Sequence, residues 1–224
     1  MQAKPNQILF PAIITLGSIL ISYYYYFTDL PVFSELVEED GVFENLTSLF
    51  LFLTAVFLIL IFAKFQSNHK LNWKIGLAIM IVGLIFGAGE EISWGQRIFG
   101  VESSDFFKQN NAQGETNLHN MVVGGTKINK IIFSYAFSVI FGIYFIILPI
   151  LYRRNDNIRR LVNQFGIPVA TNFQSILFLV ATVLVMLLDH SRKWELWEFI
   201  FAFTIFTIFV NPLNKREIQT GVKS

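Results

Sequence analysis

Long apolar stretches alternate with short polar ones along the whole chain. Windows of about 20 residues with few or no charged side chains recur, and a helix of that length can cross a hydrocarbon layer roughly 30 Å thick. These windows cover residues 8–27, 43–63, 75–96, 131–152, 169–189 and 194–210. Because lipid supplies no water to satisfy open backbone groups, each window is predicted to be helical. The pattern predicts an all-α, polytopic transmembrane bundle of about six spans that forms one integral membrane domain, residues 1–224.

The composition agrees with this class and removes several others. Hydrophobic residues make up 54% of the 224 residues and charged residues only 15%, less charge than soluble domains usually carry. The chain has no cysteine, which excludes disulfides, thiolate metal sites and a cysteine nucleophile. The net charge of +1 gives no indication of a nucleic-acid partner. One lysine precedes the first window and no A-x-A cleavage site follows it, so we expect a retained first span.

Lysine and arginine predict how the spans are oriented. When the N-terminus is placed in the cytoplasm, most of the 17 basic residues fall in the inner loops, above all in the run YRRNDNIRR. Both termini are therefore predicted to be cytoplasmic, in the inner (cytoplasmic) membrane of a bacterium. The acidic residues sort the other way, since only Asp156 and Glu217 fall inside. Most carboxylates are thus expected at the outer, periplasmic face.

Two span ends place carboxylates at that face within apolar helices. Glu44 shares one predicted helical face with Thr47 and Ser48, at i, i+3 and i+4. In GAGEEISWGQRIFG, Glu90 lies at i, Trp94 at i+4 and Arg97 at i+7, which predicts one stripe, while Glu91 is turned about 100° away. The GxxxG spacing of Gly83 and Gly87 favours close approach of a neighbouring helix.

Two further segments are predicted to place polar side chains at the same outer face of the membrane. The loop between the third and fourth windows contains His119, and the hairpin LLDHSRKWELWEF contains Asp189, His190, Glu195 and Glu198. Ionisable residues at membrane depth are functional candidates by default, so we expect one polar pocket there. The candidate catalytic residues are Glu90, Glu91, Arg97 and His119. The candidate metal ligands are Glu44, His119, Asp189, His190, Glu195 and Glu198.

Each of these features also has a purely structural explanation. Glu90 and Arg97 could form an ion pair that closes a helix end. Glu195 and Glu198 suit the first turn of a helix because of its macrodipole, and Trp94, Trp194 and Trp197 suit the interfacial aromatic belt. His119 in a loop could simply hydrogen-bond its neighbours.

Carboxylates beside imidazoles are compatible with three kinds of chemistry. Two histidines and one or two carboxylates suit a zinc ion that keeps an open position for water. A buried glutamate can instead activate water without a metal, assisted by histidine. Carboxylates that face a cavity can also bind a cation or relay protons. Neither HExxH nor HxxxH occurs in the chain, so no specific metal motif selects among them.

The residues of this constellation resemble a family of bacterial polytopic membrane proteins to which no activity is assigned. The resemblance lies in GEEISWGQRIFG, in QGETNLHN and in EEDGVFENLTSLFLFLTA, and it covers roughly residues 35–200. More distantly, Glu44-Asn45-Leu46-Thr47 is similar to an element of the alkaline ceramidase-like (CREST) hydrolases, which implies zinc-dependent chemistry. The family's Ser-x3-His element is missing, since Arg97 occupies the place of the histidine after Ser93. Glu90, Glu91 and Arg97 are similar to the EExxxR motif of CAAX-protease-like proteins, but with the spacing EEx5R.

Three functional hypotheses follow. The first is an intramembrane hydrolase of lipid-like amides or esters, in which Glu90 or Glu91 activates water and Arg97 holds a headgroup. The second is a transporter-like protein that binds a cation or proton at the same carboxylates. The third is a membrane scaffold or partner protein in which the polar cluster only locks the helices together. Membrane lipids are the expected partners in all three.

Overall fold

The computed structural model describes residues 5–118, 120–123, 126–127 and 137–220, and these residues are predominantly helical. The long helices are α1 (Pro5–Thr28), α3 (Val42–Phe65), α4 (Leu71–Glu91), α10 (Asn172–Met186) and α11 (Lys193–Val210). The shorter elements are α2 (Leu30–Leu36), η1 (Gln66–Asn68), η2 (Ser93–Gly95), α5 (Gln96–Phe99), α6 (Asp105–Asn110), α7 (Phe137–Gly142), η4 (Ile143–Ile147), α8 (Leu148–Arg154), α9 (Asp156–Gln164) and α12 (Lys215–Thr220). A hairpin pairs β1 (Val122–Val123) with β2 (Thr126–Lys127).

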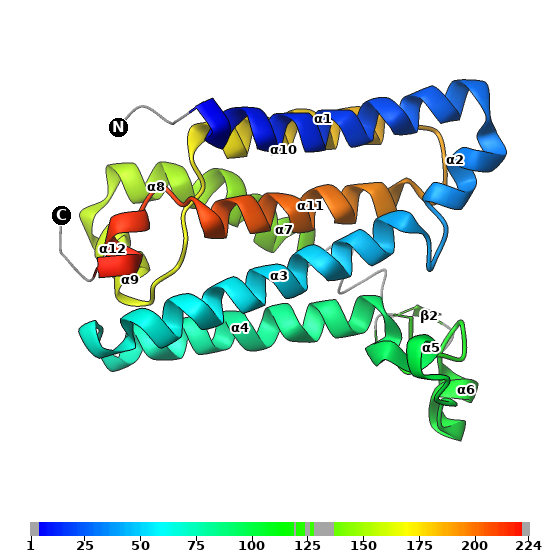
Figure 1. Cartoon of the computed structure of the whole chain (residues 1–224), viewed down its shortest axis with the longest axis horizontal. Helices are drawn as coiled ribbons and strands as arrows, with labels where there is room; N and C mark the ends of the chain where they lie inside the picture. Colours follow the sequence, from blue (N-terminus) through cyan, green and yellow to red (C-terminus); the bar gives the residue numbers. More distant parts are fainter. Residues whose placement is uncertain (1–4, 119, 124–125, 128–136, 221–224) are drawn as a thin grey trace.

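The long helices run side by side, and α11 occupies the middle of the bundle (Figure 1). It lies between α1 and α10 on one side and α3 and α4 on the other. Most of its positions from Leu196 to Phe209 are buried, whereas the outward faces of α1, α3 and α4 expose many large apolar side chains. Exposed apolar faces around a buried central helix are typical of a bundle surrounded by lipid.

Within the part of the chain that the structure describes, three helices are long and apolar enough to cross a membrane. They cover Gln7–Thr28, Val42–Asn68 and Leu71–Glu91. The membrane class predicted from the sequence is therefore confirmed at this level. The helix α10 is apolar but shorter, and α11 carries Lys193, Glu195 and Glu198 in its first two turns. For the fourth predicted window, 131–152, the described helices begin at Phe137 and continue through η4 and α8.

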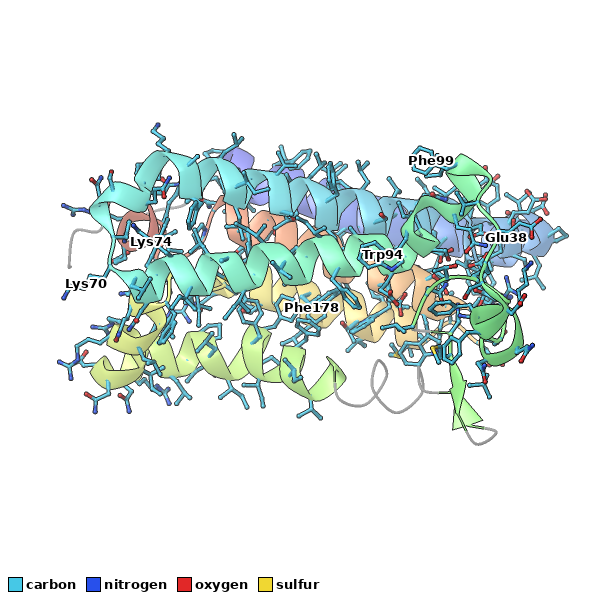
Figure 2. The ribbon with its side chains drawn as sticks, turned by 90° about the horizontal axis from the view of Figure 1, so that it is seen from below. Glu38, Lys70, Lys74, Trp94, Phe99 and Phe178 are labelled. Carbon is cyan, nitrogen blue, oxygen red and sulfur yellow. The ribbon has the colours of Figure 1, made fainter. Side chains whose placement is uncertain are left out.

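The two ends of the bundle differ sharply in charge. In Figure 2, Glu38 lies at one end, and Lys70 and Lys74 lie at the opposite end. We call the first the acidic end, which holds residues 29–44, 90–118, 120–121 and 189–198. The second is the basic end, which holds residues 64–74, 153–160 and 215–216. The helix α1 begins at the basic end, where α12 also lies (Figure 1). The separation of charge that the sequence predicts is thus a property of the fold.

Side-chain hydrogen bonds join the helices at specific points. Thr171 and Gln174 form a reciprocal capping box at the start of α10. The amide of Gln174 also donates to the carbonyl of Thr207, 3.0 Å away in α11. Within the α7–α8 segment, η4 is a π-helical turn, and the Ser175 hydroxyl donates to the Phe145 carbonyl at 2.7 Å. These bonds satisfy backbone carbonyls that lipid could not.

Where the described helices can be compared with the predicted windows, their ends differ by at most three residues, except in the third window. The helix α4 stops at Glu91, and the prediction that it continues to residue 96 is wrong. Ser93, Trp94 and Gly95 have φ of 47°, 54° and 75°, so the chain makes a left-handed turn there. For the GxxxG pair, a Cβ on Gly87 would lie 3.4 Å from Leu51 of α3, but one on Gly83 would meet nothing within 4 Å. Only Gly87 therefore allows the close approach that the spacing predicts.

Candidate functional site at the acidic end

Four glutamates from three packed helices converge at the acidic end. Glu44 lies in the first turn of α3, Glu91 ends α4, and Glu195 and Glu198 lie in the first two turns of α11. The helix α3 packs against both α4 and α11, which brings the three helix ends together. Glu91 interacts electrostatically with the other three carboxylates, and Glu44 interacts with Glu198. We call these four residues the carboxylate cluster.

A cleft of about 160 Å³ opens beside two members of the cluster. Its walls are formed by Glu44 and Glu91 together with Asp40, Asn45, Ile92 and Ile98. Glu44 is only 6% exposed, and one of its carboxylate oxygens accepts a hydrogen bond from the backbone N–H of Asp40. The lining of the cleft therefore combines polar oxygens with the side chains of two isoleucines. It is large enough for an ion with its waters or for a small organic group.

The carboxylate cluster is not neutralised by basic side chains among the described residues. None of its four members forms an ion pair with any of them. Arg192 interacts with Glu195 only at longer range. Carboxylates close together in a medium of low dielectric cannot all be ionised without a counter-charge, because their mutual repulsion is large. The cluster can therefore hold protons or attract a positively charged ligand.

Glu90 has a different role from its neighbour Glu91. It is 3% exposed, and one of its oxygens accepts the indole N–H of Trp94 at 2.8 Å. The other oxygen accepts the backbone N–H of Leu118 at 2.6 Å. Glu90 thus fastens the polar loop to the end of α4. The sequence predicts Glu90 to be catalytic together with Glu91. In the structure, both carboxylate oxygens of Glu90 instead accept hydrogen bonds that hold the loop.

The left-handed turn is held by a buried network of polar side chains. The hydroxyl of Ser93 donates to Glu115 at 2.6 Å and accepts from the side-chain amide of Asn117 at 2.8 Å. The side-chain oxygen of Gln96 accepts the backbone N–H of Thr116 at 2.8 Å. Left-handed backbone at Ser93 and Trp94 is sterically unfavourable for residues with a Cβ, and such strain persists only where neighbouring contacts enforce it. The network supplies those contacts.

The remaining predicted site residues do not join the cluster in the described structure. His119 and the side chain of Arg97 lie outside the described residues, although the backbone of Arg97 belongs to α5 rather than to α4. The ring of His190 packs edge-on against Phe33 of α2, with ring centroids 5.0 Å apart. Asp189 is exposed. Within the described residues, no three His, Asp or Glu side chains are arranged to hold a metal ion, so zinc receives no support there.

Several residues of the site were not predicted as site residues. Asp40, Asn45, Ile92 and Ile98 line the cleft, and Ser93 anchors the turn beside it. One signal for the turn is present in the sequence: Gly95 and Gly100 bracket QRIF, and glycine so close to a helix end favours a left-handed stop. The apolar wall has no comparable signal, because Ile92 and Ile98 read as parts of a continuous span.

Comparison with known proteins identified no relative of the chain. No protein-family model, no curated protein and no solved structure matches the chain.

Proposed function

We propose that this chain is an integral membrane protein of about six spans that binds a proton or an organic cation at its carboxylate cluster. In this proposal the membrane is a bacterial inner membrane, the termini are cytoplasmic and the acidic end faces outward. The observation that carries the proposal is the convergence of Glu44, Glu91, Glu195 and Glu198, without an ion pair to any described residue. Carboxylates in membrane helices are costly unless a partner or ligand offsets their charge, and they commonly mark ion or proton sites.

A thermal-shift titration tests cation binding. The melting temperature of the detergent-purified protein is measured at constant ionic strength with Na⁺, Mg²⁺, Ca²⁺ or methylammonium, and again as a function of pH. A cation that binds only the folded state stabilises it by about 2.7 kcal/mol at a concentration 100 times its Kd. We expect methylammonium or protonation, rather than a metal ion, to stabilise the wild type, and Glu91→Gln to remove that response.

The adjacent glutamate provides the matched control. Glu90→Gln removes a hydrogen-bond acceptor from the loop anchor, so its melting temperature should fall while its response to the cation persists. Glu35→Gln changes an exposed carboxylate at the same end and should alter neither property. If wild type and Glu91→Gln respond identically to every cation and to pH, the proposal is wrong. Unfolding of Glu91→Gln would instead favour the scaffold hypothesis, because breaking a buried polar cluster costs several kcal/mol.

A second candidate function is metal-free hydrolysis of a lipid-like amide or ester. It is favoured by the left-handed turn that begins two residues after Glu91, since strained backbone often accompanies active sites. In this candidate Glu91 activates water and a second cluster carboxylate donates the proton to the leaving group. The test is incubation with a panel of long-chain amides and esters. Product formed by the wild type and lost in Glu91→Gln would support it, whereas equal product from both proteins would eliminate it.

A further inference from the structure

The segment that follows the left-handed turn exposes an unusual number of large apolar side chains. In α5 and the connection to α6, Ile98 is 68% exposed, Phe99 is 77% and Val101 is 60%, and in α6 Phe106 is 57% exposed. Figure 2 shows Phe99 at the outer margin of the molecule. None of these residues lies in a helix long enough to span a membrane. We call residues 96–110 the apolar foot.

The opposite side of the apolar foot is polar and bound to the protein. Ser103 is 6% exposed and donates its hydroxyl hydrogen to the side-chain oxygen of Gln96 at 2.9 Å. The same Gln96 oxygen accepts the backbone N–H of Thr116 at 2.8 Å. The foot therefore has a polar side fastened to the loop 111–118 and an apolar side that no described residue covers. Such two-sided segments are typical of elements that lie in the plane of a membrane surface.

The foot continues the lipid-facing surface of α4. Ile79, Val82 and Phe86 form an exposed apolar stripe along α4, at i, i+3 and i+7. The Phe86 ring packs edge-on against Trp94, with ring centroids 5.7 Å apart, and Trp94 begins the turn into the foot. Tryptophan is favoured at the boundary between headgroups and acyl chains. The apolar surface thus passes from the side of α4 onto the foot through an interfacial residue.

The position of the foot along the bundle also matches a membrane surface. In Figure 1, α5 and α6 project sideways from the end of α4. Along the long axis of the molecule they stand level with the last part of α1, which is itself one of the helices able to cross a membrane. A segment that projects sideways at that level meets lipid rather than bulk water.

We propose that the apolar foot lies in the membrane leaflet at the acidic end, with Ile98, Phe99, Val101 and Phe106 inserted between the lipid chains. Ile98 also lines the cleft beside Glu44 and Glu91, so the foot and the cleft share this residue. This contact with lipid does not depend on the proposed binding of a cation. It makes the bilayer the environment from which an apolar or amphiphilic ligand would reach the cleft.

Nitroxide labels on single cysteines test this proposal directly, because the chain has no native cysteine. Phe99→Cys and Phe106→Cys are labelled in protein reconstituted into phosphatidylcholine vesicles, with Val82→Cys as the lipid reference and Glu38→Cys, an exposed position outside the foot, as the aqueous reference. Collision rates with oxygen and with a water-soluble nickel chelate are then compared. We expect both foot labels to favour oxygen, as at Val82, and to lie about 5–10 Å below the headgroups.

Two other outcomes would overturn the proposal. Labels at Phe99 and Phe106 that collide with the nickel chelate as often as the label at Glu38 would place the foot in water. Protection of both foot labels from both probes would show that protein, such as a second copy of this chain, covers the surface. Phe99 and Phe106 lie in separate helices, so a variant that fails to fold leaves the other position to decide the question.

Discussion

Ser93 combines complete burial with two side-chain hydrogen bonds and a left-handed backbone. We expect Ser93→Ala to lower the free energy of unfolding by about 1–3 kcal/mol, because the partly buried carboxylate of Glu115 and the buried amide of Asn117 each lose a partner. Ser104→Ala is the control, since Ser104 is exposed and its side chain makes no capping bond at the start of α6. Its effect should stay within about 0.5 kcal/mol. Denaturant unfolding in detergent measures both, and equal effects would contradict the anchoring role of Ser93.

The environment of His69, which lies at the basic end, predicts that the stability of the protein depends on pH. Its ring stacks on Trp73 with centroids 4.1 Å apart, and burial lowers its pKa below the ordinary value of 6.5. The unfolded chain therefore takes up a proton at a higher pH than the folded protein does. The free energy of unfolding should consequently fall as the pH drops below 6.5.

The comparison that isolates His69 is His69→Phe, which keeps an aromatic ring on Trp73 but cannot take up a proton. Melting temperatures are measured from about pH 7 to about pH 5, the range in which an ordinary histidine titrates. We expect the wild type to lose more stability than the variant across this range. Parallel curves for the two proteins would show that His69 does not titrate differently in the folded state.

At the scale of elements, hydropathy predicts the existence of the long helices better than it predicts their ends. The windows 43–63 and 194–210 differ from α3 and α11 by at most two residues at either end. The third window fails at its end because Ile92, Trp94 and Ile98 are as apolar as a membrane span requires. What stops α4 is the backbone at Ser93, and the hydrogen bonds that hold it come from Glu115 and Asn117, more than 20 residues away. The local pattern contributes only Gly95 and Gly100, and it does not show the distant contacts that hold Ser93 in place.

The packing of α4 against the segment after α9 provides a prediction at this scale. A Cβ on Gly76 would lie 2.0 Å from the backbone oxygen of Phe165, a contact that rigid backbone cannot relieve. We expect Gly76→Ala to destabilise the protein by about 1–3 kcal/mol, the usual cost of overpacking. Gly83→Ala, in the same helix with nothing within 4 Å, should be neutral or stabilising by about 0.5–1 kcal/mol. Thermal unfolding of both variants in one detergent checks the difference, and a loss in Gly83→Ala equal to that in Gly76→Ala would refute it.

At the scale of the whole molecule, the charge pattern predicts part of the site. The pattern predicts that four glutamates lie at one end of the bundle: Glu44, Glu91, Glu195 and Glu198. The reason is that apolar spans of similar length place their charged ends at the same depth in the membrane. The pattern does not predict which side chains face inward there. His190 packs on Phe33 of α2, a helix that hydropathy does not distinguish from a loop. Side-chain direction at a helix end depends on neighbours that only the folded bundle supplies.

The proposed topology is a prediction about the whole molecule, and single cysteines again test it. Six spans with cytoplasmic termini require Glu35 and Ser191, at the acidic end, to share the outer side. Ser67 and Asn157, at the basic end, must then share the inner side, which agrees with the excess of lysine and arginine there. In intact cells a membrane-impermeant maleimide should label Glu35→Cys and Ser191→Cys, and label Ser67→Cys and Asn157→Cys only after permeabilisation. Reversed labelling at all four positions would invert the orientation and place the carboxylate cluster on the cytoplasmic side. Labelling of Glu35→Cys and Ser191→Cys from opposite sides would mean an odd number of crossings between them, and the six-span bundle would be wrong.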